Sequence, residues 1–219
     1  MCGRFISGAD VISWSEYCEI LRLPPNTPPP VEGDRAPSQD ISAIRTSSEL
    51  ESREHVVLRW GLIPHWLKRR EDALNIINIR SETAPKKFRH FFERRRCLIP
   101  AAGFYEWMKL PTGKKKIKHR IRDTDRPLIS MAGLHARWTG PDGEVVESCA
   151  ILTTEPCDVV RPIHNRMPVI LPDDALDLWL DPGAARNDLE SILVPYTAET
   201  LVAEPLEPIP SAPEQGALF

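Results

Sequence analysis

The chain has 219 residues, of which 42% are hydrophobic and 27% charged, and its formal net charge is −3. This length and composition are typical of one globular domain and exclude a disordered or fibrous protein. No stretch approaches the ~20 apolar residues of a membrane-spanning helix, and no basic segment followed by an apolar run opens the chain. We therefore expect a cytoplasmic protein without a signal peptide.

Apolar residues at helical spacing predict a first helix over residues 9–21, and the Pro-rich stretch 24–37 predicts an extended loop. Short helices are expected over 88–95 and 173–180, the second with acidic residues in its first turn. Apolar or alternating runs predict strands over 41–45, 55–60, 98–108, 117–122, 127–138, 144–153 and 167–171.

Many short strands without strand–helix–strand alternation favour an α+β fold built on a mostly antiparallel sheet. We expect a single compact domain over residues 1–195. From residue 196 the chain is rich in Pro and Glu, so residues 196–219 are expected to form a mobile C-terminal tail.

The small net charge hides an uneven distribution. Residues 1–172 hold 27 Lys and Arg against 21 Asp and Glu, a net +6, whereas residues 173–219 hold one Arg against ten acids, a net −9. The basic side chains come in runs at residues 68–70, 86–89, 94–96 and 114–116. A body of this sign predicts contact with a phosphate backbone, although the run 114–116 also fits a solvated turn.

The cysteines indicate a reduced protein without a metal centre. Their number is odd and none is at CxxC spacing, so neither a disulfide framework nor a metal site is indicated, and we expect no cofactor. The five are Cys2, Cys18, Cys97, Cys149 and Cys157.

The second residue carries the most specific chemistry. Removal of Met1, which is usual before a small side chain, leaves Cys2 with a free α-amine and a thiol on neighbouring carbons. An α-amine with a pKa of ~7.7–8.0 is partly neutral at physiological pH, and it adds to an aldehyde to give a Schiff base. The thiol then closes a thiazolidine ring, which an internal Cys cannot do, although position two alone is also consistent with chance.

Polar residues inside apolar surroundings form further motifs. They lie in MCGRF at residues 1–5, WGLIPHW at 60–66, IINIRSET at 76–83, LIPAAGFYEW at 98–107 and IHNRMPVIL at 163–171. In this order the five motifs resemble the SRAP family, abasic-site sensors of the DNA damage (SOS) response that crosslink themselves to single-stranded DNA. The resemblance runs from Cys2 to about Pro172 and implies the family's barrel-like sheet with short flanking helices.

The resemblance implies a catalytic set of Cys2, Asn78, Glu106 and His164. Cys2 is the nucleophile, first through nitrogen and then through sulfur. Glu106, with aromatic neighbours at a strand end, is the expected acid/base for the Cys2 amine. His164 is the expected second proton carrier, which assists opening of the sugar ring. Asn78 is expected to hold the Cys2 terminus or the sugar through uncharged hydrogen bonds.

The implied ligand is single-stranded DNA with an abasic site. Arg4 and Arg80 are expected phosphate ligands, and Arg166 is a further candidate that can instead pair with a core carboxylate. Trp60 and Trp66 are expected to stack on unpaired bases, with Trp60 also partly structural.

The C-terminus carries a separate motif. Gln215, Leu218 and Phe219 resemble the bacterial sliding-clamp motif, in which a disordered segment inserts two apolar side chains into a pocket. We expect a monomer of the bacterial cytoplasm, associated with the nucleoid.

Two alternatives remain open. Cys2, Glu106 and His164 also fit an N-terminal-nucleophile thiol peptidase or autoprotease, the activity by which the family is labelled. A non-catalytic binder of single-stranded DNA or clamp adaptor is the other, and it predicts that Cys2→Ala changes nothing.

Overall fold

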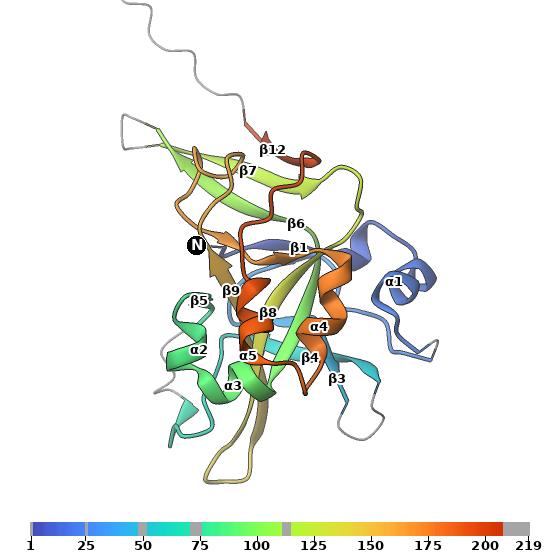
Figure 1. Cartoon of the computed structure of the whole chain (residues 1–219), viewed down its shortest axis with the longest axis vertical. Coiled ribbons are helices and arrows are strands. Elements are labelled where there is room, and N and C mark those ends of the chain that lie inside the picture. The colour runs from blue at the N-terminus through green and yellow to red at the C-terminus, as the bar shows by residue number, and fades with distance from the viewer. Residues whose placement is uncertain (1, 25, 48–51, 71–75, 111–114, 208–219) are drawn as a thin grey trace, which may run out of the picture.

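The computed structural model describes residues 2–24, 26–47, 52–70, 76–110 and 115–207. Within them the chain forms a twelve-stranded sheet with short helices packed on it (Figure 1). The strands are β1 (Phe5–Ser7), β2 (Asp34–Arg35), β3 (Asp40–Thr46), β4 (Arg53–Trp60), β5 (Asn78–Arg80), β6 (Arg96–Lys109), β7 (Lys116–Asp123), β8 (Ile129–Thr139), β9 (Val145–Thr154), β10 (Met167–Pro168), β11 (Ile170–Leu171) and β12 (Leu201–Pro205).

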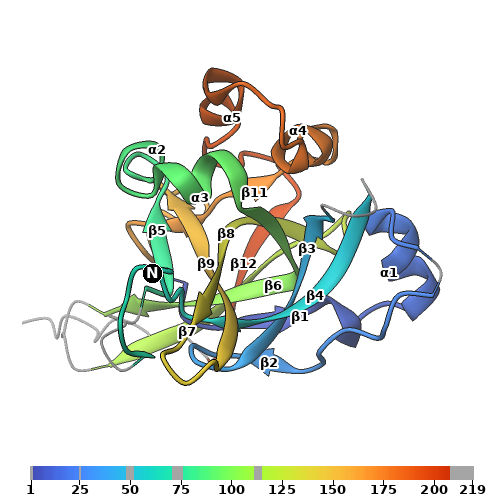
Figure 2. The ribbon, with the colours of Figure 1, turned by 90° about the horizontal axis from the view of Figure 1, so that it is seen from below.

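The helices are short. The 3₁₀ helices are η1 (Gly8–Asp10) and η3 (Asp173–Ala175), and the α-helices are α1 (Trp14–Leu21), α2 (Ala84–Lys87), α3 (Arg89–Arg94), α4 (Leu176–Leu180) and α5 (Arg186–Ser191). In the described part of the chain none of them has the length and apolar character that a membrane crossing requires. Figure 2 shows α2 to α5 gathered on one side of the sheet, and β7, β1 and β2 on the opposite side.

Five strands close on themselves as a barrel. β6 pairs with β8, β8 with β9, β9 with β4 and β4 with β3, and β3 returns to β6 through Ile44 and Leu98. All pairings in this ring are antiparallel except that of β4 with β9. Closure leaves these strands without a free edge. The expected α+β class, with a mostly antiparallel, barrel-like sheet and short flanking helices, is confirmed.

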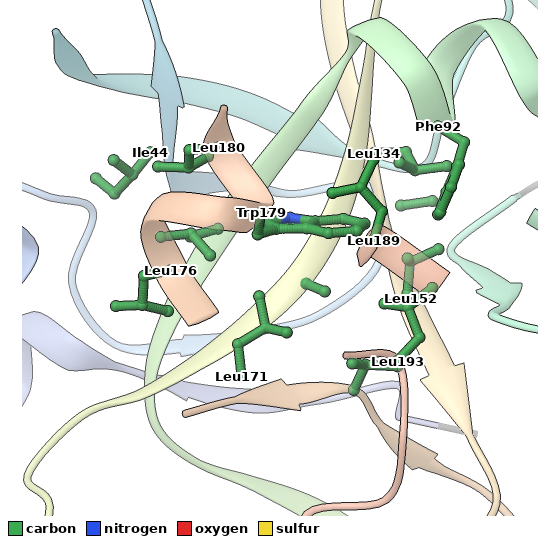
Figure 3. Packing of buried hydrophobic residues seen from close by; sticks show 14 of the residues in the cluster. Ile44, Phe92, Leu134, Leu152, Leu171, Leu176, Trp179, Leu180, Leu189 and Leu193 are labelled. Carbon is green, nitrogen blue, oxygen red and sulfur yellow. The ribbon is translucent and has the colours of Figure 1, made fainter. Parts of the chain in front are cut away.

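The core has two parts, one on each face of the barrel strands. Alternate residues of β8 and β9 fall into different clusters, so Met131 and Ile151 belong to one and Ala132 and Leu152 to the other. The second cluster packs under the helices, where Trp179 of α4 lies among leucines and Phe92 (Figure 3). The cluster that contains Met131 and Ile151 fills the barrel interior. Because both faces are covered, β8 is buried at every position from 129 to 136, as its nearly continuous apolar sequence predicts.

Cys2 belongs to the interior cluster. The strand β1 that follows it pairs with β6 through Phe5 and Phe104, and Phe5 packs against Trp60 with ring centroids 5.3 Å apart. These apolar contacts draw the N-terminal segment onto the barrel and leave Cys2 fully buried.

Most of the expected elements are confirmed within a few residues, and the first helix is shorter than expected. Residues 8–10 form the 3₁₀ turn η1, and α1 begins only after Ser13, whose hydroxyl accepts a hydrogen bond from the Glu16 N–H at 3.3 Å. Arg22 ends α1 in the left-handed conformation, with φ of 53°. The N-cap and the left-handed residue set these limits, and helical spacing alone cannot reveal them.

The expected domain boundary at residue 195 is too early. Residues 201–205 form β12, which pairs with β7 from Leu201–Asp123 to Pro205–His119. Glu204 on this strand accepts hydrogen bonds from Arg120 at 2.7 Å and Arg122 at 2.6 Å. The pairing and these charges hold a segment whose Pro and Glu content suggested a tail. Gln215, Leu218 and Phe219 lie outside the described residues.

Candidate active site

The backbone of Cys2 is held by Asn78. The Asn78 Nδ2 donates a hydrogen bond of 2.8 Å to the Cys2 carbonyl oxygen, across a sequence separation of 76 residues. Arg4 is held in turn, since its carbonyl accepts from the Tyr105 N–H at 2.9 Å. The start of the chain is thereby fixed between β5 and β6.

Asn78 reaches this position because β5 runs parallel to β9, with Asn78 opposite Ile151. Trp60 supports the entry to β5 through an Nε1 hydrogen bond of 2.9 Å to the Ile77 carbonyl. Trp60 is completely buried in the barrel interior, so the expectation that it stacks on DNA bases is wrong. Its aromatic surface is used for packing, and its N–H for placing β5.

Glu106 lies close to the Cys2 thiol. It is 2% exposed, on the inward face of β6. Burial raises the pKa of the Cys2 thiol far above its ordinary value, and the nearby Glu106 carboxylate raises that pKa further. The thiol therefore stays protonated at neutral pH, next to a group that can exchange protons with the N-terminal amine.

His164 lies on the segment between β9 and β10. Its Nδ1 lies 3.1 Å from the Arg166 backbone nitrogen and 3.2 Å from the Arg166 carbonyl oxygen, so the Arg166 backbone engages this side of the ring. The ring is only partly buried, so Nε2 can face a ligand. The structure thus brings Asn78 and Glu106 to Cys2, and places His164 on the segment between β9 and β10.

Arg80 and Arg166 converge on the end of β9. Arg80 pairs with Thr153 in the β5–β9 register, and the Arg166 guanidinium donates to the Thr153 carbonyl. The Arg80 side chain is exposed, whereas Arg166 is 12% exposed and binds both carboxylate oxygens of Glu82, at 2.6 and 2.9 Å. These hydrogen bonds lower the pKa of Glu82. Arg80 thus keeps an open guanidinium, while that of Arg166 is partly neutralised.

Arg4 and Trp66 present open side chains elsewhere on the surface. Arg4 is 44% exposed and lies 3.7 Å from Asp34. Trp66 is 55% exposed and packs on Phe91, with ring centroids 5.5 Å apart. The free indole face fits the stacking role predicted for Trp66.

Most side chains of the basic runs are exposed to solvent. Residues 68–70, 86, 87, 89, 94 and 95 are exposed, as are Lys115 and Lys116, while Lys114 lies outside the described residues. Arg96 is the exception, because it is buried and donates to the carbonyls of Phe92, Trp179 and Asp181. It joins β6 to α3 and α4 and cannot contact DNA.

Sequence reasoning missed one buried polar residue beside the site. His119 of β7 is 5% exposed and lies directly opposite Glu106 in the β6–β7 ladder. The available signal was a polar residue at an inward position of the alternating segment 116–123. Among the described residues no group of His, Cys, Asp and Glu side chains is arranged to hold a metal ion.

Known proteins of the same kind resemble the whole chain. The family model of the SOS response associated peptidases (SRAP) matches residues 1–209. The abasic site processing protein YoqW of Bacillus subtilis (strain 168) is 36% identical over 220 residues, which cover 99% of this chain and 97% of YoqW. The abasic site processing protein HMCES of Mus musculus is 26% identical over 228 residues, which cover 89% of this chain and 62% of HMCES.

Solved structures agree with this similarity. A protein from Bordetella bronchiseptica superposes with a TM-score of 0.79 at 30% identity, over 94% of this chain and 100% of its own. A protein from Bacteroides thetaiotaomicron gives a TM-score of 0.79 at 28% identity, over 94% of this chain and 92% of its own. The chain belongs to the SOS response associated peptidase (SRAP) family.

Proposed function

We propose that this protein captures abasic sites in single-stranded DNA by forming a covalent thiazolidine through Cys2, after removal of Met1. Its relatives YoqW and HMCES are named abasic site processing proteins. The observation that carries the proposal is the placement of Cys2, whose carbonyl is held by Asn78 while its thiol is buried beside Glu106. An N-terminal residue fixed in this way presents amine and thiol together to one electrophile.

The opened abasic deoxyribose supplies an aldehyde. The Cys2 amine adds to the aldehyde carbon, the carbinolamine loses one water, and a Schiff base forms. The thiol sulfur then adds to the same carbon, and its proton passes to the nitrogen, which closes the ring. The whole sequence releases one water and needs neither an oxidant nor a reductant.

Each polar side chain has a part in this sequence. The Glu106 carboxylate takes the proton that the Cys2 amine must lose before it attacks. His164 donates a proton from Nε2 to the sugar oxygen as the furanose ring opens, or to the departing hydroxyl of the carbinolamine. Asn78 keeps the Cys2 backbone in place without adding a charge that would compete with the amine.

The DNA strand is held by the exposed cations and by Trp66. Arg4 and Arg80 bind phosphates on either side of the missing base, and Arg166 stabilises the loop edge through Glu82 or exchanges that partner for a phosphate. Trp66 stacks on a neighbouring base. Unpaired DNA suits this site because its backbone bends easily toward a buried residue.

The thiol-peptidase alternative fits the site less well. A thiol peptidase attacks as a thiolate, which requires a lowered pKa, whereas burial and Glu106 raise the pKa of the Cys2 thiol. Aldehyde capture does not have this requirement, because the amine attacks first. The two reactions therefore differ in that aldehyde capture requires a primary α-amine at Cys2, whereas attack by the thiol alone does not.

The test is a denaturing gel with intact-mass measurement, using purified protein and a single-stranded oligonucleotide with one abasic site. Wild type is compared with Cys2→Ala and with a form that retains Met1. We expect a stable adduct for wild type alone, with the combined mass less one water. An adduct that persists in Cys2→Ala, or none in wild type, would refute the mechanism.

The C-terminal motif supports a second partner on sequence grounds only. A sliding clamp that binds Gln215, Leu218 and Phe219 would bring the protein, as a monomer, to replication forks. Deletion of Phe219 is expected to weaken binding to the purified clamp and to leave DNA crosslinking unchanged. Equal clamp affinity with and without Phe219 would eliminate this partner.

A further inference from the structure

One polar rung interrupts an apolar ladder between β6 and β7. Phe104 lies opposite Ile121 and Met108 opposite Ile117, and between these two apolar pairs Glu106 lies opposite His119. Both polar side chains are almost fully buried, at 2% and 5% exposure. Directly opposed residues share a face of the sheet, with Cβ atoms ~4.5–5.5 Å apart. The two ionisable groups therefore lie side by side at the level of the active site.

The His119 ring has a defined orientation. Its Nδ1 lies 3.1 Å from the Ile117 carbonyl oxygen. Since a carbonyl only accepts, Nδ1 carries the proton in this hydrogen bond, and the neutral ring leaves Nε2 with a lone pair. A lone pair beside a carboxylate is unfavourable in a buried site. The arrangement is stable when one additional proton is bound, on the imidazole or on the carboxyl group.

We propose that His119 is a positioning residue for Glu106, and that the two side chains share one proton and set the protonation state in which Glu106 serves the Cys2 amine. This inference rests on the proposed aldehyde capture at Cys2. His119 touches neither the amine nor the DNA in this scheme and acts through Glu106.

Apolar residues surround His119 along β7 and β12. On β7 the inward neighbours of His119 are Ile117 and Ile121, and the next inward ionisable residue is Asp123, which accepts a hydrogen bond of 2.7 Å from Tyr196. On the other side, β12 places Pro205 opposite His119.

The charged residues that follow His119 at alternate positions of β7 lie on the outward face of the sheet. Arg120 and Arg122 are engaged with Glu204 on the outward face. From the N-terminal segment, the Cys2 thiol is near enough for Glu106 to raise the thiol pKa.

The shared proton has a role in each step. With the imidazole protonated, Glu106 is a carboxylate and accepts the proton of the attacking amine. The neutral Glu106 then returns that proton as the carbinolamine loses water. His119 thereby holds one proton of the pair while Glu106 accepts and returns the proton of the amine.

The test is the pH profile of the single-turnover crosslinking rate, between about pH 5 and pH 9. His119→Phe fills the same space without a proton site, and we expect its acid limb to lie at higher pH. A displacement of about one pH unit corresponds to about a tenfold slower rate on that limb. His119→Gln can form hydrogen bonds but cannot be protonated, so we expect it to behave as His119→Phe.

The control is the same substitution in a Glu106→Gln background, where His119→Phe should leave the profile unchanged. An unchanged acid limb in His119→Phe, or recovery of the wild-type profile in His119→Gln, would overturn the proposal. A displacement that persists in the Glu106→Gln background would do the same. Thermal melts show whether each variant is folded. Failure of the proposed function is distinct, because wild type would then give no adduct.

Discussion

The Asn78 Nδ2 donates a hydrogen bond of 2.8 Å to the Cys2 carbonyl and so ties the N-terminal segment to β5. We predict that Asn78→Ala slows crosslinking by about tenfold to a hundredfold, because a lost hydrogen bond to a buried group costs ~1–3 kcal/mol. Asn78→Asp keeps the size but cannot donate, so it should be equally slow. Single-turnover rates check this, and a wild-type rate in Asn78→Asp would show that donation to Cys2 is not needed.

The buried thiol of Cys2 gives a second residue-scale prediction. Burial and Glu106 raise the thiol pKa, so the folded protein holds less thiolate at any given pH than a free cysteine does. We expect slow alkylation of Cys2 by iodoacetamide near neutral pH, and fast alkylation once the protein is unfolded in urea. Peptide mass mapping distinguishes Cys2 from the other cysteines. Rapid alkylation of Cys2 in the folded protein would restore the thiol-peptidase reading.

The residues of the site differ in how far the sequence could reveal them. Cys2 stands out by its place after Met1, and Asn78 and Glu106 stand out as polar residues in apolar segments; the structure brings these three together. Trp60 was wrongly placed in contact with DNA, because its sequence motif does not distinguish an exposed indole from a buried one. His119 was missed because its meaning depends on the strand register, which pairs it with Glu106.

At the scale of elements, the long strands could be predicted, and among the short ones only β10 and β11 could, as a single strand over 167–171. β7 alternates buried and exposed residues along its whole length, and β8 is continuously apolar, so each carries its own signal. β5 has only three residues and is held in place by its pairing with β9. In the same way, β12 is held by its pairing with β7. Such strands are stabilised by distant partners, and a local pattern contains no trace of those partners.

The two tryptophans should respond differently to substitution. Trp60 fixes β5 through Ile77, so Trp60→Ala should destabilise the protein by ~3–5 kcal/mol, while Trp60→Phe should keep affinity for single-stranded DNA. Trp66→Ala should leave thermal stability nearly unchanged and weaken DNA binding by ~1–3 kcal/mol. Thermal melts and fluorescence anisotropy measure both effects. Equal losses of DNA affinity in Trp60→Phe and Trp66→Ala would contradict this division of roles.

The strand β12 should be held to β7 in a pH-dependent manner. Hydrogen bonds from Arg122 and Arg120 lower the pKa of Glu204 to about 2. Because the pKa is lowered on folding, this contribution is complete above the ordinary Glu value of ~4.3 and is lost as pH falls toward the folded value.

We predict that Glu204→Gln increases amide hydrogen exchange in β7 and β12 at neutral pH and leaves the barrel strands unchanged. Wild type should approach the exchange of the variant only under strongly acidic conditions. Hydrogen-exchange mass spectrometry resolves the two regions. Identical exchange of β12 in both proteins at neutral pH would show that backbone pairing alone holds the strand.

At the scale of the whole molecule, the closed barrel explains how a residue at the start of the chain becomes buried and held in place. A terminus is usually exposed and poorly ordered, but here β1 lies against β6 and Cys2 joins the interior cluster. The helices cover the opposite face of the same strands, around Trp179 (Figure 3). The barrel interior therefore surrounds Cys2, and the proposed reaction requires the DNA to approach Cys2 from the protein surface.

The uneven charge of the molecule should appear in the salt dependence of DNA binding. Residues 1–172 carry a net +6 and residues 173–219 a net −9, so we expect the phosphate-binding surface to lie in the first part. For single strands the slope of log affinity against log salt is about −0.7 per neutralised phosphate.

In a Cys2→Ala background, which prevents crosslinking, Arg80→Gln should weaken binding and make the slope shallower by ~0.7. Arg186→Gln is the matched control, because Arg186 pairs with Glu190 on α5 and lies in the acidic part. If Arg186→Gln changes the slope as much as Arg80→Gln does, the effect is one of net charge, and Arg80 is not a phosphate ligand.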